Sequence, residues 1–374
     1  MELSNEDNLR LNVLLRQNLK AVRIDESRMV VHGLTDKGEA RVPLNPTCKE
    51  ERYLRLVREV FSTYVLGSPG GYPVYIRRWT RMGQARDEES LENLLLLGEP
   101  EAVTAVVHAP ELSPEIAANA WWAHPTAENA RQLLKKQQIV ASELGKELAN
   151  YLLEFLPFET EAKAQIDSIT LILQPGLIDD ATVAKLWKNA RRKQAFYIGF
   201  MHTRPRDLPE TGPAHPLHAD VAASLAELGA DDPVAALLEQ TLGPQGQQFL
   251  LTAEHVINKA SNQEAVVELM NAIGNYYAAI RPDLRRFRNV EAIVERTAQP
   301  DIDEKIAPIT SRHPELEEAA RAMLGLALID EYVVAETFGH TDAIGTVMRK
   351  RLLPVTTPLL GLMKALNPNI AVKS

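Results

Sequence analysis

The sequence has one cysteine in 374 residues, so no disulfide bond can form within the chain. A lone cysteine is usual in proteins of a reducing compartment. The longest apolar stretches, such as residues 322–329, are far below the about 20 residues that cross a bilayer. The acidic first seven residues contain no apolar signal segment. These absences predict a cytoplasmic protein that does not enter a membrane.

An excess of positive charge is also missing. The chain carries 41 lysines and arginines against 50 aspartates and glutamates, which gives a formal net charge of −9. Nonspecific attraction of the whole molecule to nucleic acid or anionic lipid is therefore not expected. Hydrophobic residues (45%) and charged residues (24%) are close to the averages of soluble globular proteins, which excludes bulk disorder. The length favours two or three structural units.

The motifs that identify common catalytic and cofactor-binding sites are absent. The sequence contains no Gly-x-Gly-x-x-Gly, no P-loop, no Gly-x-Ser-x-Gly, no Cys-x-x-Cys and no Glu-x-x-His. The glycine-rich stretch 67–71 follows a predicted helix rather than opening one, which argues against a phosphate cradle. The sequence therefore names no reaction and no cofactor, and we expect a protein that is not an enzyme.

The first 86 residues predict a small α+β unit. Short apolar segments at 21–25, 28–32 and 40–44 are separated by turn residues, which is typical of a β-meander. Pro43 predicts that the last of these strands lies at a sheet edge, because proline cannot donate to a strand ladder. Apolar residues then repeat every three or four positions from Tyr53 to Tyr64, which predicts a helix ending at the glycines 67–71. Residues 73–79 predict one more strand.

From residue 87 onward the sequence predicts helices, in a first region 87–202 and a second region 217–374 that form one domain or two. The proline-rich stretch 203–216 is the predicted loop between them. Ser113 and Asp232 each precede a proline as predicted helix caps, and residues 261–264 and 301–304 fit capping boxes. The predicted helices are 91–97, 101–108, 115–123, 127–136, 143–155, 161–173, 182–200, 221–228, 253–280 and 314–336. For the last of these, an interruption at Gly325 is left open.

The predicted fold class is therefore mainly α. Many short capped helices indicate an irregular or solenoid-like array of helical hairpins, in which one hairpin buries what its neighbour cannot. No fixed repeat period holds along the sequence. The small α+β unit with its β-meander precedes this array.

Cys48 is the candidate reactive thiol. If Thr47 caps the following helix, the thiol lies in the first helical turn, where the helix dipole favours a thiolate. Lys49 and Arg52 add positive charge nearby. This setting suits a nucleophile or a persulfide carrier, whereas the alternative is a small residue without reactivity.

Two segments combine basic and aromatic residues. Residues 52–81 contain six arginines and one acid, and residues 185–206 contain seven lysines or arginines and no acid. Such segments bind single-stranded nucleic acid, a sulfonate or phosphate ligand, or an acidic partner surface. The alternative is a solvated basic face with the aromatic rings in the core. The candidate binding patch consists of Arg77, Arg78, Trp79, Arg81, Lys185, Lys188, Arg191, Arg192 and Lys193.

Three histidines and an aspartate are weak candidates for a metal site. His215, His218 and Asp220 are close in the sequence, and His202 lies upstream. Their spacing is not that of a zinc motif, so we expect no bound metal.

Several longer strings resemble a known family. The segments LRLNVLL (9–15), RIDESRMVVH (23–32) and VLGSPGGYPVY (65–75) are similar to the DsrS family, as are RRWTRMGQ (77–84), AWWA (120–123), EFLPFE (154–159) and LQPGLID (173–179). The resemblance covers most of the first 200 residues. It implies a cytoplasmic accessory or regulatory protein, without a known cofactor, of the reverse-acting dissimilatory sulfite reductase system in sulfur-oxidising bacteria. It implies no catalytic residues.

The sequence thus leads to one main hypothesis and two alternatives. The main hypothesis is a non-catalytic accessory protein of sulfur oxidation that acts through contacts with other proteins of that system. The first alternative is a regulator that binds RNA through the basic-aromatic segments. The second is a sulfur carrier or sulfurtransferase that uses Cys48.

Overall fold

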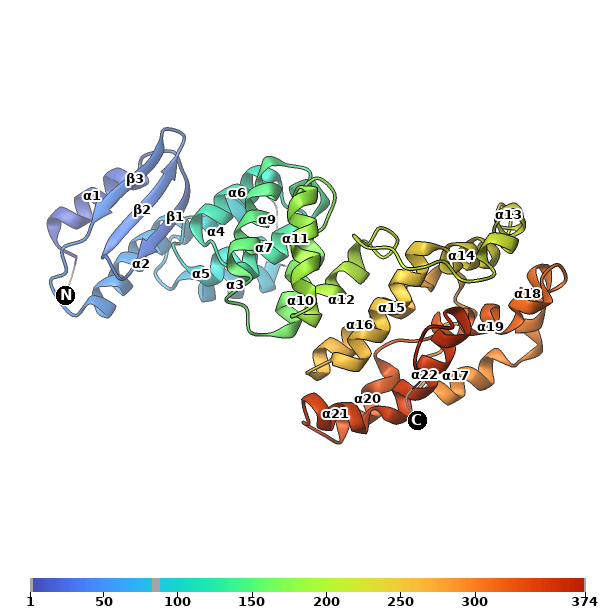
Figure 1. Ribbon diagram of the computed structural model, residues 1–374. Coiled ribbons are helices and arrows are strands. Elements are labelled where there is room, and N and C mark those ends of the chain that lie inside the picture. The colour runs from blue at the N-terminus through green and yellow to red at the C-terminus, as the bar shows by residue number, and fades with distance from the viewer. Residues whose placement is uncertain (1–2, 83–87, 373–374) are drawn as a thin grey trace. The chain divides into compact units, whose positions relative to one another are not determined.

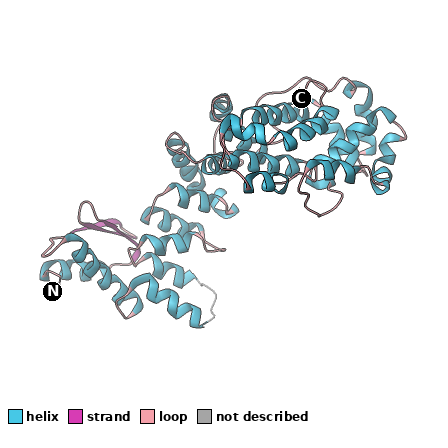
Figure 2. Cartoon of the chain, turned by 90° about the horizontal axis from the view of Figure 1, so that it is seen from below, coloured by secondary structure: helices cyan, strands magenta, loops and turns pink. Residues whose placement is uncertain are grey.

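The computed structural model describes residues 3–82 and 88–372, and all of their side chains except those of 77–82. The chain forms two compact units, Met1–Phe155 and Leu156–Ser374 (Figure 1). Among the described residues, β-strands occur only near the N-terminus, and the rest of the structure is helical (Figure 2). The mainly helical fold with a small N-terminal α+β part is as predicted.

The first unit begins with the predicted β-meander. Strands β1 (Leu19–Asp25), β2 (Val30–Thr35) and β3 (Gly38–Pro43) pair antiparallel in that order. Pro43 ends the edge strand β3, as its missing N–H requires. Helices α1 (Asn5–Leu15) and α2 (Glu50–Leu66) share one core with the sheet, formed by residues such as Leu11, Val31, Val42 and Phe61.

The predicted strand at 73–79 is wrong. This segment belongs to helix α3 (Gly71–Met82), which follows α2 after a left-handed Gly67 with φ +67°. The spacing of Tyr72, Tyr75 and Ile76 is in fact that of a helix, and Pro73 lies in the first turn, where its missing N–H is tolerated. The hydroxyl of Ser62 accepts a hydrogen bond from the Gly71 amide at 2.8 Å and fixes the turn between the two helices.

The remainder of the first unit consists of short helices that pack on one another. Ser113 and Thr126 cap two of them by accepting hydrogen bonds from the amides three residues ahead. Helices α4 and α6 also contact β1, so the sheet and the first hairpins belong to one unit. The helices are α4 (Glu88–Leu95), α5 (Pro100–Val107), α6 (Pro114–Ala123), α7 (Ala127–Leu134), α8 (Gln137–Val140) and α9 (Glu143–Phe155).

The described residues of the second unit form helices and loops and no β-strand. Helix α12 contacts α10, α11, α15 and α16. Residues before and after the predicted loop 203–216 therefore share one core. Its first helices are α10 (Ala162–Ile172), α11 (Asp180–Ala190), α12 (Gln194–Thr203), α13 (His218–Leu228), α14 (Pro233–Leu242), α15 (Pro244–Lys259) and α16 (Gln263–Tyr276). The later ones are α17 (Val290–Thr297), α18 (Pro300–Thr310), α19 (Glu317–Leu326), α20 (Tyr332–Gly339), α21 (Gly345–Arg351) and α22 (Leu353–Leu366).

Three predicted long helices are interrupted. The predicted helix 182–200 is split at 191–193, 253–280 at 260–262, and 314–336 at 327–331. At the second break Asn262 accepts a hydrogen bond from the Ala265 amide and starts α16. The predicted capping box at 301–304 is also wrong, because α18 begins at Pro300 and Asp301 pairs with Arg296 instead. Residues 204–217 form the predicted loop.

The predicted division points, after residue 86 and within 203–216, fall inside the two units. The described residues contain no helix that combines the length and the apolar character needed to cross a bilayer.

Candidate functional site

The predicted binding patch comprises two groups of residues in different units. Arg77, Arg78, Trp79 and Arg81 belong to α3, and their side chains lie outside the described residues. Lys185, Lys188, Arg191, Arg192 and Lys193 lie on α11 and on the turn that follows it. The structure describes the side chains of only this second group.

Helix α11 is amphipathic, and its basic residues occupy the outer face. Asp179 caps the helix by accepting a hydrogen bond from the Thr182 amide at 2.8 Å. Val183 and Leu186 are buried, whereas Lys185 and Lys188 are exposed one turn apart. Arg192 is exposed in the turn that follows α11 and extends this face. The small exposed residues of α11 are alanines and an asparagine. We call Lys185, Lys188 and Arg192 the basic face.

The aromatic residues of this segment are in the core and do not accompany the basic face. Trp187 is 3% exposed, and its ring meets the edges of Tyr197 and Phe200 at centroid distances of 4.8 and 5.1 Å. Phe196 is buried as well. The expectation that these rings form an exposed stacking surface is therefore wrong for residues 185–206. Their packing instead fixes α11 against α12, which makes the basic face rigid.

The charges of the basic face are not neutralised by neighbouring acids. Arg191 pairs with Glu210 at 3.0 Å, and the Lys193 ammonium lies 5.5 Å from the centre of the Phe196 ring. In contrast, no carboxylate among the described residues lies within ion-pair distance of Lys185, Lys188 or Arg192. Three unpaired positive charges on one side of a rigid hairpin can bind an anionic surface without first breaking an internal ion pair.

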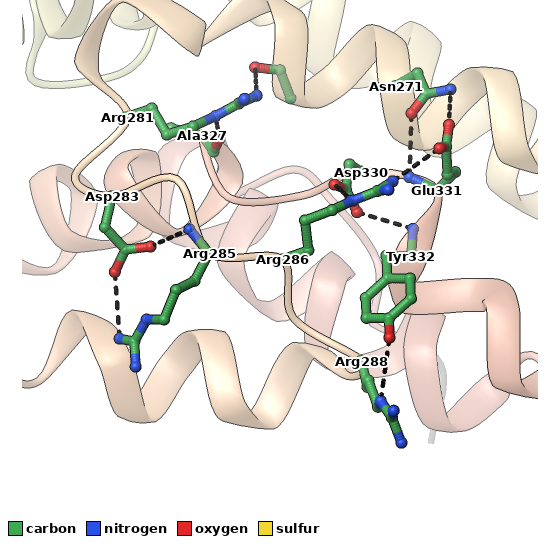
Figure 3. Close-up of polar contacts among 11 residues, drawn as sticks. Asn271, Arg281, Asp283, Arg285, Arg286, Arg288, Ala327, Asp330, Glu331 and Tyr332 are labelled. Atoms are coloured by element: carbon green, nitrogen blue, oxygen red, sulfur yellow. Dashed lines mark hydrogen bonds and ion pairs between the residues drawn. The ribbon is translucent and has the colours of Figure 1, made fainter.

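Unpaired charge distinguishes this face from the most arginine-rich segment of the chain, the loop 281–289. Arg286 lies between two carboxylates, at 2.7 Å from Asp330 Oδ2 and 2.7 Å from Glu331 Oε1 (Figure 3). Its hydrogen bond lowers the pKa of the Glu331 carboxyl below its ordinary range, and a second hydrogen bond, from Asn271, acts in the same direction. Arg285 pairs with Asp283 at 3.2 Å.

The same loop makes further hydrogen bonds within its own unit. Arg281 Nε donates to the Ala327 carbonyl at 2.7 Å, and Arg288 Nε donates to the Tyr332 hydroxyl at 3.3 Å. A Cβ added at Gly274 would overlap the Ile329 carbonyl oxygen, so the backbones of α16 and of residues 327–331 are in direct contact. The loop 281–289 is therefore a brace that joins α16 to the C-terminal helices. The sequence shows that this segment is rich in arginine, but it does not show that these arginines are paired with carboxylates.

Cys48 is not in a helical turn. Helix α2 begins at Glu50, and its N-cap is Lys49, which makes no side-chain capping bond. The predicted cap at Thr47 is therefore wrong, and the thiol precedes the helix. Cys48 is half-buried against the core of the first unit, with its Sγ 3.7 Å from the Lys49 carbonyl.

The candidate metal ligands are not brought together. His218 Nε2 lies 3.3 Å from Glu239, and His215 Nδ1 accepts a hydrogen bond from the Leu217 amide. Burial lowers the pKa of His215 below its ordinary range. Asp220 lies in the first turn of α13, while His202 is on α12. Across residues 3–82 and 88–372, no group of three His, Cys, Asp or Glu side chains is arranged to hold a metal ion.

His202 belongs instead to an ion-pair cluster that the sequence does not reveal. Its Nε2 lies 3.3 Å from Glu268 Oε2, and Lys163 Nζ lies 2.9 Å from Glu268 Oε1 and 2.8 Å from Asp167. The His202–Glu268 contact is poorly aligned for a hydrogen bond and is electrostatic. Together His202 and Lys163 lower the pKa of the Glu268 carboxyl to about 2. The cluster ties α10 and α12 to α16.

No model of a known protein family, no curated protein and no solved structure matches this chain.

Proposed function

We propose that this protein is a non-catalytic accessory protein that binds an acidic surface of a partner protein through the basic face of α11. The observation that carries the proposal is the set of three exposed cations, Lys185, Lys188 and Arg192, that have no carboxylate partner among the described residues. In a chain of net charge −9, internal acids are abundant. Cations left unpaired in such a chain are free to pair with a partner, where complementary charge gives orientation and fast association.

The resemblance to the DsrS family supplies the biological context of this proposal. It supports a partner among the proteins of bacterial sulfur oxidation, because that family accompanies the reverse-acting dissimilatory sulfite reductase system. The buried ring contact between α11 and α12 supports a docking role, since Trp187 and Tyr197 hold the basic face in one conformation.

The two alternatives use other features. RNA phosphates would also pair with the basic face, but base stacking there would need rings other than Trp187, Phe196, Tyr197 and Phe200, which are buried. A sulfur-carrier function would use Cys48, whose thiol lies in the first unit. Intact-mass spectra after incubation with a sulfur donor would show a gain of one sulfur atom if that alternative holds.

Charge reversal of the basic face tests the main proposal. The full-length protein is immobilised and exposed to extracts of sulfur-oxidising cells, and captured proteins are identified and then titrated in purified form. The triple variant K185E/K188E/R192E should weaken the identified complex by about 3 kcal/mol, a factor of a hundred in Kd, because each exposed attraction becomes a repulsion. Raising the salt concentration should weaken the wild-type complex in the same way.

A matched control lies on α2, where K49E/R52E/R55E makes the same change in net charge. Glu51 and Glu59 are spaced four residues from Arg55 on that helix, so this surface has mixed charge. The control should bind as tightly as the wild type. The proposal fails if the wild type captures no sulfur-oxidation protein, or if both triple variants lose the same affinity. Loss of the captured complex after RNase treatment would favour the RNA alternative.

A further inference from the structure

A cavity of about 380 Å³ lies among α15, α16, α21 and α22 in the second unit. Its floor is made of aliphatic and thioether side chains, of which Leu269 and Met270 are fully buried. A volume of this size is typical of sites that enclose a small organic ligand. The apolar lining includes Ile257, Val266, Leu269, Met270, Leu352 and Leu360.

Two cations lie at this cavity, and no acid lines it. Arg349 and Lys350 both belong to α21 and contribute to the lining. Arg349 is held in place because Nη1 donates to the Ala260 carbonyl at 2.7 Å and Nη2 donates to the Thr346 hydroxyl at 3.0 Å. A guanidinium group has five N–H donors, so three remain for a ligand.

The charge of these two cations has no internal counterpart. Among the residues that the structure describes, no carboxylate lies within ion-pair distance of Arg349 or Lys350. Thr346, Thr356 and Thr357 also line the cavity. An apolar chamber with two unpaired cations is complementary to one chemical class, an anion with an aliphatic tail.

We propose that this cavity binds an aliphatic monocarboxylate, with its tail against the floor and its carboxylate at Arg349 and Lys350. The inference does not depend on the basic face of α11. The bidentate geometry of a carboxylate matches two parallel N–H donors of a guanidinium group, which Lys350 reinforces as a second charge.

A medium-chain acid is a suitable probe for this cavity. The cavity volume of about 380 Å³ falls in the lower part of the range for small-molecule sites. Decanoate is an aliphatic monocarboxylate of that size class. A shorter acid leaves apolar wall exposed, and each missing methylene group should weaken binding by about fourfold.

Calorimetric titration of the full-length protein with decanoate tests the proposal. One decanoate should bind per chain. Octanoate, which lacks two methylene groups, should bind more weakly by about sixteenfold. Decanol, which has the same tail without charge, should bind more weakly by about ten- to hundredfold. Titration with vesicles of anionic phospholipid is a separate arm, because Ile344 and Val347 are exposed apolar residues next to the same cations.

Three variants locate the ligand. T357W fills the cavity from a partly exposed wall and should abolish binding, and K350E should weaken it at least tenfold. R351E is the matched control, because Arg351 is exposed on the same helix but does not line the cavity. It should bind within twofold of the wild type at 0.15 M salt, which screens an exposed charge that does not line the cavity.

Several results would overturn the proposal. One is the absence of saturable decanoate binding below its micelle concentration in a wild type that is folded by circular dichroism. Equal binding by the wild type, K350E and T357W would place the ligand elsewhere. Vesicle binding that depends on Lys350 without binding of free decanoate would assign these cations to a lipid surface.

Discussion

Replacing Tyr53 by phenylalanine should destabilise the first unit by about 2 kcal/mol. The Tyr53 hydroxyl donates to Asp7 Oδ2 at 2.5 Å, and both side chains are fully buried. Burial raises the pKa of Tyr53 above its ordinary range, so the hydroxyl keeps the proton that it donates. The remaining donors to the carboxylate are the Asn45 amide at 2.7 Å and the Asn45 side chain at 3.3 Å.

The magnitude follows from the state of Asp7 after the substitution. A hydrogen bond to a charged group contributes about 1.5–3 kcal/mol, and the carboxylate of the variant would remain buried with one donor fewer. No cation among the described residues lies within ion-pair distance of Asp7, so nothing replaces the lost donor. A loss of 2 kcal/mol raises the rate of hydrogen exchange about thirtyfold for amides that exchange through unfolding of the unit.

Hydrogen exchange with mass spectrometry on the full chain measures this change for each unit separately. Peptides from α1 and α2 should exchange faster in Y53F, whereas peptides from α15 in the second unit should not change. Y64F is the matched control, because Tyr64 lies on the same helix but is 58% exposed. The reasoning is refuted if Y53F and Y64F exchange alike, or if the double variant with D7A shows no coupling between the two sites.

Three further outcomes are expected in the second unit. Because the pKa of Glu268 is lowered from 4.5 to about 2, its carboxylate stabilises the fold above pH 4.5 and this stability is lost as the pH falls towards 2. E268Q should therefore cost about 2 kcal/mol at pH 7 after allowance for solvent screening, and nothing near pH 2, as measured by urea unfolding. G274A should destabilise by about 2–3 kcal/mol because its Cβ would overlap the Ile329 carbonyl, with a lowered urea midpoint as the readout. G361A on α22, where a Cβ meets nothing within 4 Å, should stabilise by about 0.5–1 kcal/mol, and equal midpoints for the two glycine variants would contradict both predictions.

The sequence predicts best those elements whose signal is local. The β-meander, helix α2 and the caps at Ser113 and Asp232 each depend on residues within a few positions of one another, and the structure confirms them. Helix α3 was missed because Val74, Tyr75 and Ile76 have high strand propensity, although their neighbours follow the helical period. For this segment strand propensity and helical periodicity predict different structures, and the periodicity predicts the observed helix.

The helix breaks depend on partners that are distant in the sequence. Residues 327–331 leave the helical path because Asn271 and Arg286 bind Glu331 there, and both come from other elements. At 191–193 the chain turns so that Tyr197 can meet Trp187 across the hairpin. Neither partner is visible in a window of a few residues.

The candidate sites show the same difference between local signals and distant partners. The sequence identified Lys185 and Lys188 as basic residues on one helical face, and this is where they lie. It could not tell which cations are paired, so the neutralised loop 281–289 and the unpaired basic face have the same appearance in a count of charges. Arg349 was missed entirely, because only tertiary packing places it at an apolar cavity.

The backbone contact between α16 and residues 327–331 has a consequence for biosynthesis. Helix α16 cannot complete its packing at Gly274 until the chain has been translated beyond Ile329. At about 5–20 residues per second, the ribosome needs roughly 10–35 s to pass from the end of the first unit to this point. The N-terminal unit can fold during that interval, while the side of α16 that packs on residues 327–331 stays uncovered. Molecular chaperones would therefore encounter the nascent protein mainly through its second unit.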